Sequence, residues 1–209
     1  MYSANLDFTR QQGKTHLIKF GGEFRYNTLR WYNLGAYPGV AGLAAPWEGF
    51  TGTDEEWYRL YRNAARAEYY GYDFYGNKAD EGDWFRNEDG SLEEGRPDGA
   101  KHPIIASAYI QDKVEFEDLI LNLGLRFDYL NANDWQFIDI YHPFSHGGDT
   151  RVFDAADVED SKVHTFFSPR LGFAYPVSVN TVFHAQYGKF YQLPRLVDLY
   201  ASKYYVDIL

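Results

Sequence analysis

The sequence predicts an all-β fold: an antiparallel transmembrane β-barrel segment of about six strands with long extracellular loops. Three observations predict it. Apolar and polar residues alternate over several long runs, as in a strand whose two faces meet different surroundings. Each of the best runs reaches the roughly 9 to 11 residues that a tilted strand needs to cross a bilayer. Short and long connections alternate along the chain, which is typical of outer-membrane barrels of bacteria.

The clearest pattern is a hairpin made of residues 106–116 and 119–129, joined at Glu117. If 117–118 form a tight turn, Ile110 faces Leu125 on one apolar side. A soluble antiparallel sheet with one solvated face alternates in the same way, so the hairpin alone leaves both interpretations open. The opposite side of the hairpin carries Ser107, Tyr109, Gln111, Lys113, Glu115, Asn122, Gly124, Arg126 and Asp128.

The other strands show the same alternation in order along the chain. The last one is expected to turn Phe183, Tyr187 and Tyr191 toward the apolar side. Alternation also sends Asp112 toward lipid, so we expect it near the periplasmic interface or turned inward by a bulge. The expected strands are residues 2–10, 15–27, 103–116, 119–130, 163–175 and 180–192.

One face of these strands is predicted to meet a watery lumen, because it combines charges of both signs with small glycines. Its side chains either line a solute path or form a polar ladder that braces the wall. The lumen-facing polar residues are Lys19, Glu23, Arg25, Lys113, Arg126, Asp128 and Arg170.

The long connections 27–101, 131–162 and 193–209 are expected to be extracellular. In the first of them, 53–56 fits a capping box and apolar residues follow at helical spacing, which predicts a short amphipathic helix from Asp54 to Tyr69. Loops on a rigid wall commonly carry binding residues. The candidate ligand-binding side chains are the loop aromatics Trp57, Tyr61, Tyr69, Tyr72 and Trp84.

Composition excludes several classes of protein. The net charge of -10 disfavours nucleic acid as a partner, since phosphate binding requires a basic surface. Most of that charge lies in 68–99 and 134–160, outside the strands. A mean hydropathy of -0.50 excludes a helical membrane protein, whereas barrel strands need only alternate apolar residues. The aromatic share of 19% fits interfacial girdles, and the absence of cysteine excludes thiol chemistry.

The acidic and histidine-containing loops are candidates for metal or enzyme sites, with a solvated loop as the alternative. Oxygen ligands cluster around glycine in 80–90, so this acidic loop is either a calcium site or a solvated segment, but its spacing does not match an EF-hand. His142, His146 and Asp149 lack a rigid helix to hold zinc. No spacing selects a catalytic pair of carboxylates. We therefore expect no metal, no other cofactor and no enzymatic activity.

Four strand motifs carry a resemblance to a known family. The segments 109–113, 123–129, 168–173 and 187–194 resemble barrel strands of TonB-dependent outer-membrane receptors, with the closest likeness to the Oar-like branch, which has a carboxypeptidase-regulatory-like domain. The resemblance implies a 22-stranded barrel of which this chain is a fragment without signal peptide or plug domain.

The same resemblance implies a function and its partners. It implies import of a scarce small ligand of the siderophore, oligosaccharide or peptide class across the bacterial cell outer membrane. Expected partners are outer-membrane lipid and, through the plug region that this fragment lacks, the TonB complex. The alternative from a different class is a soluble or surface-exposed β-domain that binds carbohydrate through aromatic residues.

Overall fold

The computed structural model describes residues 1–33, 51–53, 68–72, 76–80, 98–143 and 155–200. The chain forms two compact units that we describe separately. Unit 1 contains residues 1–27, 103–133 and 162–195, and unit 2 contains 28–102, 134–161 and 196–209. Among the described residues, no helix has the length and hydropathy needed to cross a membrane.

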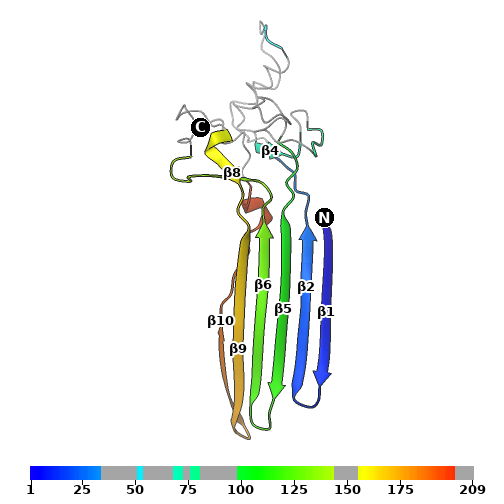
Figure 1. Cartoon of the computed structure of the whole chain (residues 1–209), viewed down its shortest axis with the longest axis vertical. Coiled ribbons are helices and arrows are strands. Elements are labelled where there is room, and N and C mark those ends of the chain that lie inside the picture. The colour runs from blue at the N-terminus through cyan, green and yellow to red at the C-terminus, as the bar shows by residue number, and fades with distance from the viewer. Residues whose placement is uncertain (34–50, 54–67, 73–75, 81–97, 144–154, 201–209) are drawn as a thin grey trace. The chain divides into compact units, whose positions relative to one another are not determined.

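Unit 1 is one antiparallel sheet of six strands in the order β1-β2-β5-β6-β9-β10 (Figure 1). The all-β antiparallel fold expected from alternation is therefore confirmed. Among the described strands, β1 and β10 each have a neighbour on one side only, so this sheet is open. The strands are β1 (Tyr2–Gln12), β2 (His16–Tyr26), β5 (Ile104–Glu115), β6 (Ile120–Asn131), β9 (His164–Ser178) and β10 (Thr181–Gly188).

Tight turns after β1, β5 and β9 lie together at one end of the sheet, the lower end in Figure 1. Gly13 has a φ of 64° in the first turn, a conformation that glycine adopts without steric cost. In the second turn the Phe116 amide donates to the Leu119 carbonyl at 2.8 Å, which confirms the turn expected at 117–118. The chain leaves β2, β6 and β10 at the opposite end of the sheet to make the long connections.

The strand register assigns each side chain to one of the two faces. Ile110 lies opposite Phe20 on β2 and opposite Leu125 on β6, as the alternation predicted. Leu125 is in turn opposite Pro169 on β9. This apolar face is uncovered within the unit, and Ile110 and Leu125 are 55% and 46% exposed. The fold of unit 1 therefore leaves its most apolar surface without a protein layer over it.

Asp112 lies on this apolar face without a bulge, because it pairs with Ile18 and Leu123 in regular register. Its Oδ2 is 2.7 Å from Nδ1 of His16, which is on the same face next to the first turn. An acid near the turn end is tolerated because its charge has a hydrogen-bonding partner and is far from the centre of the strands.

The last strand is shorter than expected, since β10 ends at Gly188 rather than near residue 192. Beyond it the alternation no longer fixes the faces, and the expected outward position of Tyr191 is wrong. Its ring packs at 4.7 Å from that of Phe166, which is opposite Asp128 on the hydrophilic face. At the other end of the same hairpin, β9 continues past residue 175 to Ser178.

The described residues of unit 2 form two short strand pairs, two 3-10 helices and turns. Its most buried side chains include Tyr69 and Tyr70, which are 2% and 4% exposed. The Tyr70 ring lies 6.0 Å from the ring of Tyr200, so separate segments of unit 2 share this small core. The elements are β3 (Trp31–Asn33) paired with β4 (Glu68–Tyr70), β7 (Trp135–Phe137) paired with β8 (Val158–Asp160), and the 3-10 helices η2 (Ala155–Asp157) and η3 (Leu196–Asp198).

Candidate functional site on the hydrophilic face

The hydrophilic face of the sheet in unit 1 is the best candidate for a functional surface. Strand register places all the polar residues that the sequence singled out on this one face, on β2, β5, β6 and β9. That this face lines a lumen stays a prediction. The residues are Lys19, Glu23, Arg25, Lys113, Arg126, Asp128 and Arg170.

Several charges on this face are paired within their own strand. Arg126 contacts Asp128, with Nη2 at 2.8 Å from Oδ1, and the Asp128 side chain is only 8% exposed. Nε of Arg25 is 3.0 Å from Glu23 Oε1. Residues two apart on a strand point to the same side, so each pair is a local consequence of the sequence. Partly exposed pairs of this kind contribute little stability in water, about 0 to 1 kcal/mol.

A hydrogen bond also crosses the strands between Tyr109 and Asp7. The Tyr109 hydroxyl donates to Asp7 Oδ1 at 2.6 Å, although β1 and β5 are separated by β2. Gly21 is the residue between them in the register. A Cβ at Gly21 would lie 2.8 Å from the Tyr109 ring and 2.5 Å from Oδ1 of Asp7, so only glycine leaves room for this contact.

Two cations on the face have no carboxylate partner among the residues that the structure describes. Lys19 is exposed and makes no ion pair there, and Arg170 is instead 5.0 Å from the centre of the Phe190 ring. Both line a groove of about 280 Å³, together with Arg126 and Tyr109. The lining contains no acidic side chain. The groove is therefore positively charged.

A second groove of about 520 Å³ adjoins the first, because Gln111, Gly124 and Arg170 line both. Its other polar side chains are the amides of Asn122 and Gln186. Gly124, Gly172 and Gly188 also line this groove, and because glycine has no side chain they leave space between the amides. An amide both donates and accepts hydrogen bonds, so the surface is suited to a hydroxylated solute.

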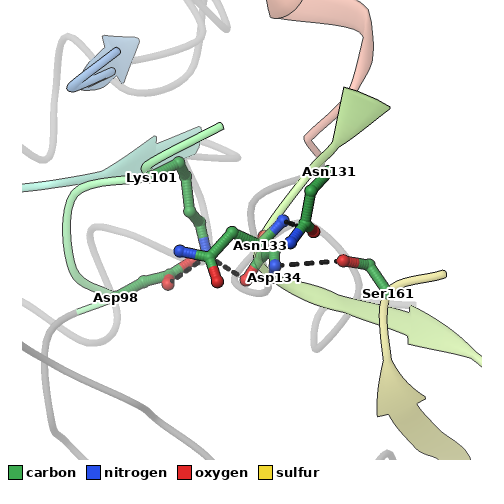
Figure 2. A network of polar contacts seen from close by, with 6 residues as sticks. All are labelled: Asp98, Lys101, Asn131, Asn133, Asp134 and Ser161. Atoms are coloured by element: carbon green, nitrogen blue, oxygen red, sulfur yellow. Dashed lines mark hydrogen bonds and ion pairs between the residues drawn. The ribbon is translucent and has the colours of Figure 1, made fainter. Parts of the chain in front are cut away.

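Unit 2 holds a buried cluster of charges that the sequence did not reveal (Figure 2). Lys101 Nζ is 2.8 Å from Asp98 Oδ1 and 2.9 Å from Asp134 Oδ1. The side chains of Lys101 and Asp98 are 6% and 5% exposed, and that of Asp134 is 15% exposed. The Ser161 hydroxyl accepts a hydrogen bond from the Asp134 amide at 3.1 Å. Two long connections thus meet at one ammonium group.

Burial and the neighbouring charges shift the pKa values of the residues in this cluster. Burial raises the pKa of Asp134 to about 6, and the neighbouring negative charge of Asp98 adds to the rise while Lys101 opposes it. Burial alone would lower the pKa of Lys101, but the two carboxylates outweigh it and the net shift is upward. Burial, and then the charge of Asp134, also raises the pKa of Tyr200.

The loop aromatics expected to bind ligand are only partly within the described residues. Trp57, Tyr61 and Trp84 lie outside them, as do residues 54–67 of the expected helix. The end of that prediction is wrong, because Glu68 and Tyr69 belong to strand β4 and pair with β3. Tyr69 is 2% exposed and its ring is 5.6 Å from that of Tyr32, which is also 5.8 Å from Tyr72. Tyr69 is therefore a packing residue in unit 2. Binding of ligand by these side chains stays a prediction.

The candidate calcium and zinc segments fall largely outside the described residues, including His146 and Asp149. In the described part, His142 Nδ1 is 3.1 Å from Asp139 Oδ2. That carboxyl also accepts hydrogen bonds from the backbone amides of Tyr141 and His142, and these contacts lower its pKa. Among the described residues, no group of three or more potential ligands is arranged to hold a metal ion.

Long antiparallel strands with one lipid-compatible face, one hydrophilic face and alternating connections define the wall of an outer-membrane barrel. The chain matches the family model described as TonB dependent receptor-like, beta-barrel over residues 1–207. It therefore belongs to the TonB-dependent receptor β-barrel family, whose members are receptors and transporters of the bacterial outer membrane. No curated protein and no solved structure matches the chain.

Proposed function

We propose that this chain is part of the barrel of a receptor that captures a scarce ligand at the cell surface and imports it across the outer membrane. The connection pattern carries the proposal. Tight turns follow β1, β5 and β9 at one end of the sheet, and long segments leave from the other end. Outer-membrane barrels place short turns in the periplasm and long loops outside. Residues 27–101, 131–162 and 193–209 are accordingly the extracellular loops.

The apolar face supports outer-membrane lipid as its partner. Leu123 and Phe167 on it are 44% and 57% exposed. A soluble β-domain has to cover such a face with a second layer of structure. For this reason the proposal favours the receptor over a carbohydrate-binding soluble domain. Transport would draw its energy from the TonB complex through the plug region of the full-length receptor.

Two finer assignments belong to the same proposal. The four strand motifs support the Oar-like branch of the family. The first three lie on β5, β6 and β9, and the fourth begins at the end of β10 and continues beyond it. The ligand is proposed to be a siderophore, an oligosaccharide or a peptide that first meets the loops, because loops carry binding residues while the rigid wall positions them. The protein acts as a transporter rather than as an enzyme.

Deletion of residues 81–97 from the full-length protein tests ligand capture by the loops. It removes Trp84 and many acidic side chains but keeps Asp98 and Lys101. The ends can be joined by a short linker, since the Ala100 amide donates to the Ala79 carbonyl at 3.1 Å. A long loop can be shortened at small entropic cost, so the barrel should still insert.

We expect this deletion to abolish growth on the limiting nutrient while surface display, measured with an external protease, is unchanged. Deletion of 144–154 is the matched control, because that loop carries none of the candidate aromatic residues. It should leave growth intact. Normal uptake without 81–97 would show that the ligand is recognised elsewhere.

A further inference from the structure

One row of paired residues runs across the sheet from β2 to β9 and lines the two grooves. Lys19 on β2 is opposite Gln111 on β5, which is opposite Gly124 on β6, which is opposite Arg170 on β9. Neighbouring strands are about 4.8 Å apart, so the backbones of Lys19 and Arg170 are separated by about 14 Å. Their long side chains enter the same groove from its two sides.

The middle of that row is kept open by Gly124. An added Cβ there would contact the Arg170 Cβ at 3.7 Å and the Gln111 Cγ at 3.9 Å, so glycine is the residue that leaves free volume between these side chains. The Phe190 ring lies at 5.0 Å beneath the Arg170 guanidinium. Stacking on an aromatic ring restricts a guanidinium while its hydrogen-bond donors stay available.

Two of the three cations that line this groove are not balanced by a carboxylate of the described residues. Arg126 is neutralised by Asp128, but Lys19 and Arg170 have no carboxylate partner within the described ranges. Elsewhere on the same face, Arg25 and Lys113 are each paired with a glutamate. Carboxylate and phosphate oxygens are the groups that a guanidinium and an ammonium lining one groove can bind through charged hydrogen bonds.

We propose that Lys19 and Arg170 form a binding site for an oxyanion, a carboxylate or phosphate group, on the hydrophilic face of the sheet. The amides of Gln111, Asn122 and Gln186 in the adjoining groove bind the hydroxylated body that carries the anion. That this solute is the imported ligand rests on the proposed function. Binding of the oxyanion itself does not.

Binding of inorganic phosphate and of citrate to full-length protein in detergent tests this site, by calorimetry at constant ionic strength with chloride as the reference anion. The variant K19Q/R170Q removes both unpaired cations. The control R25Q/K113Q removes the same charge from the same face at positions that are already paired. Retained β-sheet signal in circular dichroism shows that each variant is folded.

We expect saturable binding by the wild type and by the control, and at least about tenfold weaker binding by K19Q/R170Q, because charged hydrogen bonds are lost. R170K should bind with intermediate affinity, since it keeps the charge but loses the planar fork. Equal binding by wild type and K19Q/R170Q would overturn the site.

Another result would also overturn it. If the wild type binds neither anion and K19Q/R170Q has a lower melting temperature, another part of the receptor neutralises these cations. The proposed function is tested separately: a receptor that binds anion but imports nothing contradicts only that function, and one that imports its ligand but binds no oxyanion contradicts only this site.

Discussion

The sheet of unit 1 and the compact unit 2 differ in which side chains they expose and which they bury. In the sheet, apolar side chains such as Ile110 and Leu125 are exposed, and charged side chains share the opposite face. In unit 2, some charged residues are buried: Lys101 is 5% exposed and Asp157 is fully buried. The sheet is thus suited to lipid on one side, whereas unit 2 buries polar contacts in addition to its small aromatic core.

This difference indicates which kind of substitution should destabilise each unit. A charge placed on the apolar face would meet hydrocarbon, and loss of a charge inside unit 2 would leave its partner buried and unpaired. The two kinds of substitution should therefore affect different parts of the molecule, and the following variants of the full-length protein separate them.

Lys101→Met should have the largest effect. It leaves Asp98 and Asp134 buried without their shared cation, and breaking a buried ion pair costs about 3 to 5 kcal/mol. Hydrogen exchange at the amides of Leu29 and Ala100 should accelerate, while exchange in the sheet is unchanged. The triple variant K101M/D98N/D134N should recover most of the loss. Slow exchange in the single variant would show that the cluster does not stabilise unit 2.

Leu125→Arg should have the next largest effect, and on the other unit. A cationic side chain near the centre of a lipid-facing strand costs about 2 to 4 kcal/mol. Asn122→Arg adds the same charge to the hydrophilic face of β6 and is the control. Urea unfolding in lipid bilayers measures both. Equal destabilisation by the two variants would contradict the assignment of the faces.

Gly21→Ala probes the hydrophilic face of the sheet. The new Cβ would lie 2.5 Å from the Leu6 carbonyl oxygen and 2.5 Å from Asp7 Oδ1, so backbone or side chain must shift. Overpacking of this kind costs about 1 to 3 kcal/mol. Gly172→Ala is the control, because its nearest neighbour would be 3.6 Å away. Unfolding free energies in bilayers should fall for Gly21→Ala alone, and a similar loss in both variants would contradict the packing.

The pH dependence of unit 2 should be the smallest effect. Asp134 has a pKa of about 6 when folded and 3.8 when unfolded, so the folded state takes up its proton first. Its contribution to stability therefore rises as the pH falls through 6 toward 4. Between pH 7 and pH 5 the gain is about 1 kcal/mol.

Hydrogen exchange at Ala100, corrected for the intrinsic pH dependence of exchange, measures this gain. Asp134→Asn removes the titrating group and should flatten the profile. A wild-type profile that matches that of the variant, or a loss of stability between pH 7 and pH 5 that Asp134→Asn removes, would contradict the sign of the shift.

Strand faces could be predicted from the sequence because the side-chain period in a strand is two. Once the turn at 117–118 was placed, Val114 had to lie opposite Leu121, and it does. The prediction failed for Tyr191, because β10 ends at Gly188 and periodicity applies only inside a strand.

The buried cluster of unit 2 could not be predicted. Asp98 and Lys101 are close in sequence, but Asp134 comes from another connection, and no periodicity relates residues across two irregular segments. The sequence places Asp98 and Asp134 only in two acidic connections, 68–99 and 134–160, and does not indicate that they meet. That Lys19 and Arg170 have no carboxylate partner in the described part of the chain could not be predicted either, since sequence gives the face of a residue but not the carboxylates within its reach.

The sidedness of the connections tests the central claim most directly. Tyr141 in a long connection is 83% exposed and Val179 in a tight turn is 102% exposed, so cysteine at either position would be accessible to a thiol reagent. The chain has no cysteine of its own. On intact cells, a membrane-impermeant maleimide should label Tyr141→Cys and should label Val179→Cys only after the outer membrane is permeabilised. Equal labelling of both on intact cells would contradict the account of this chain as a barrel wall.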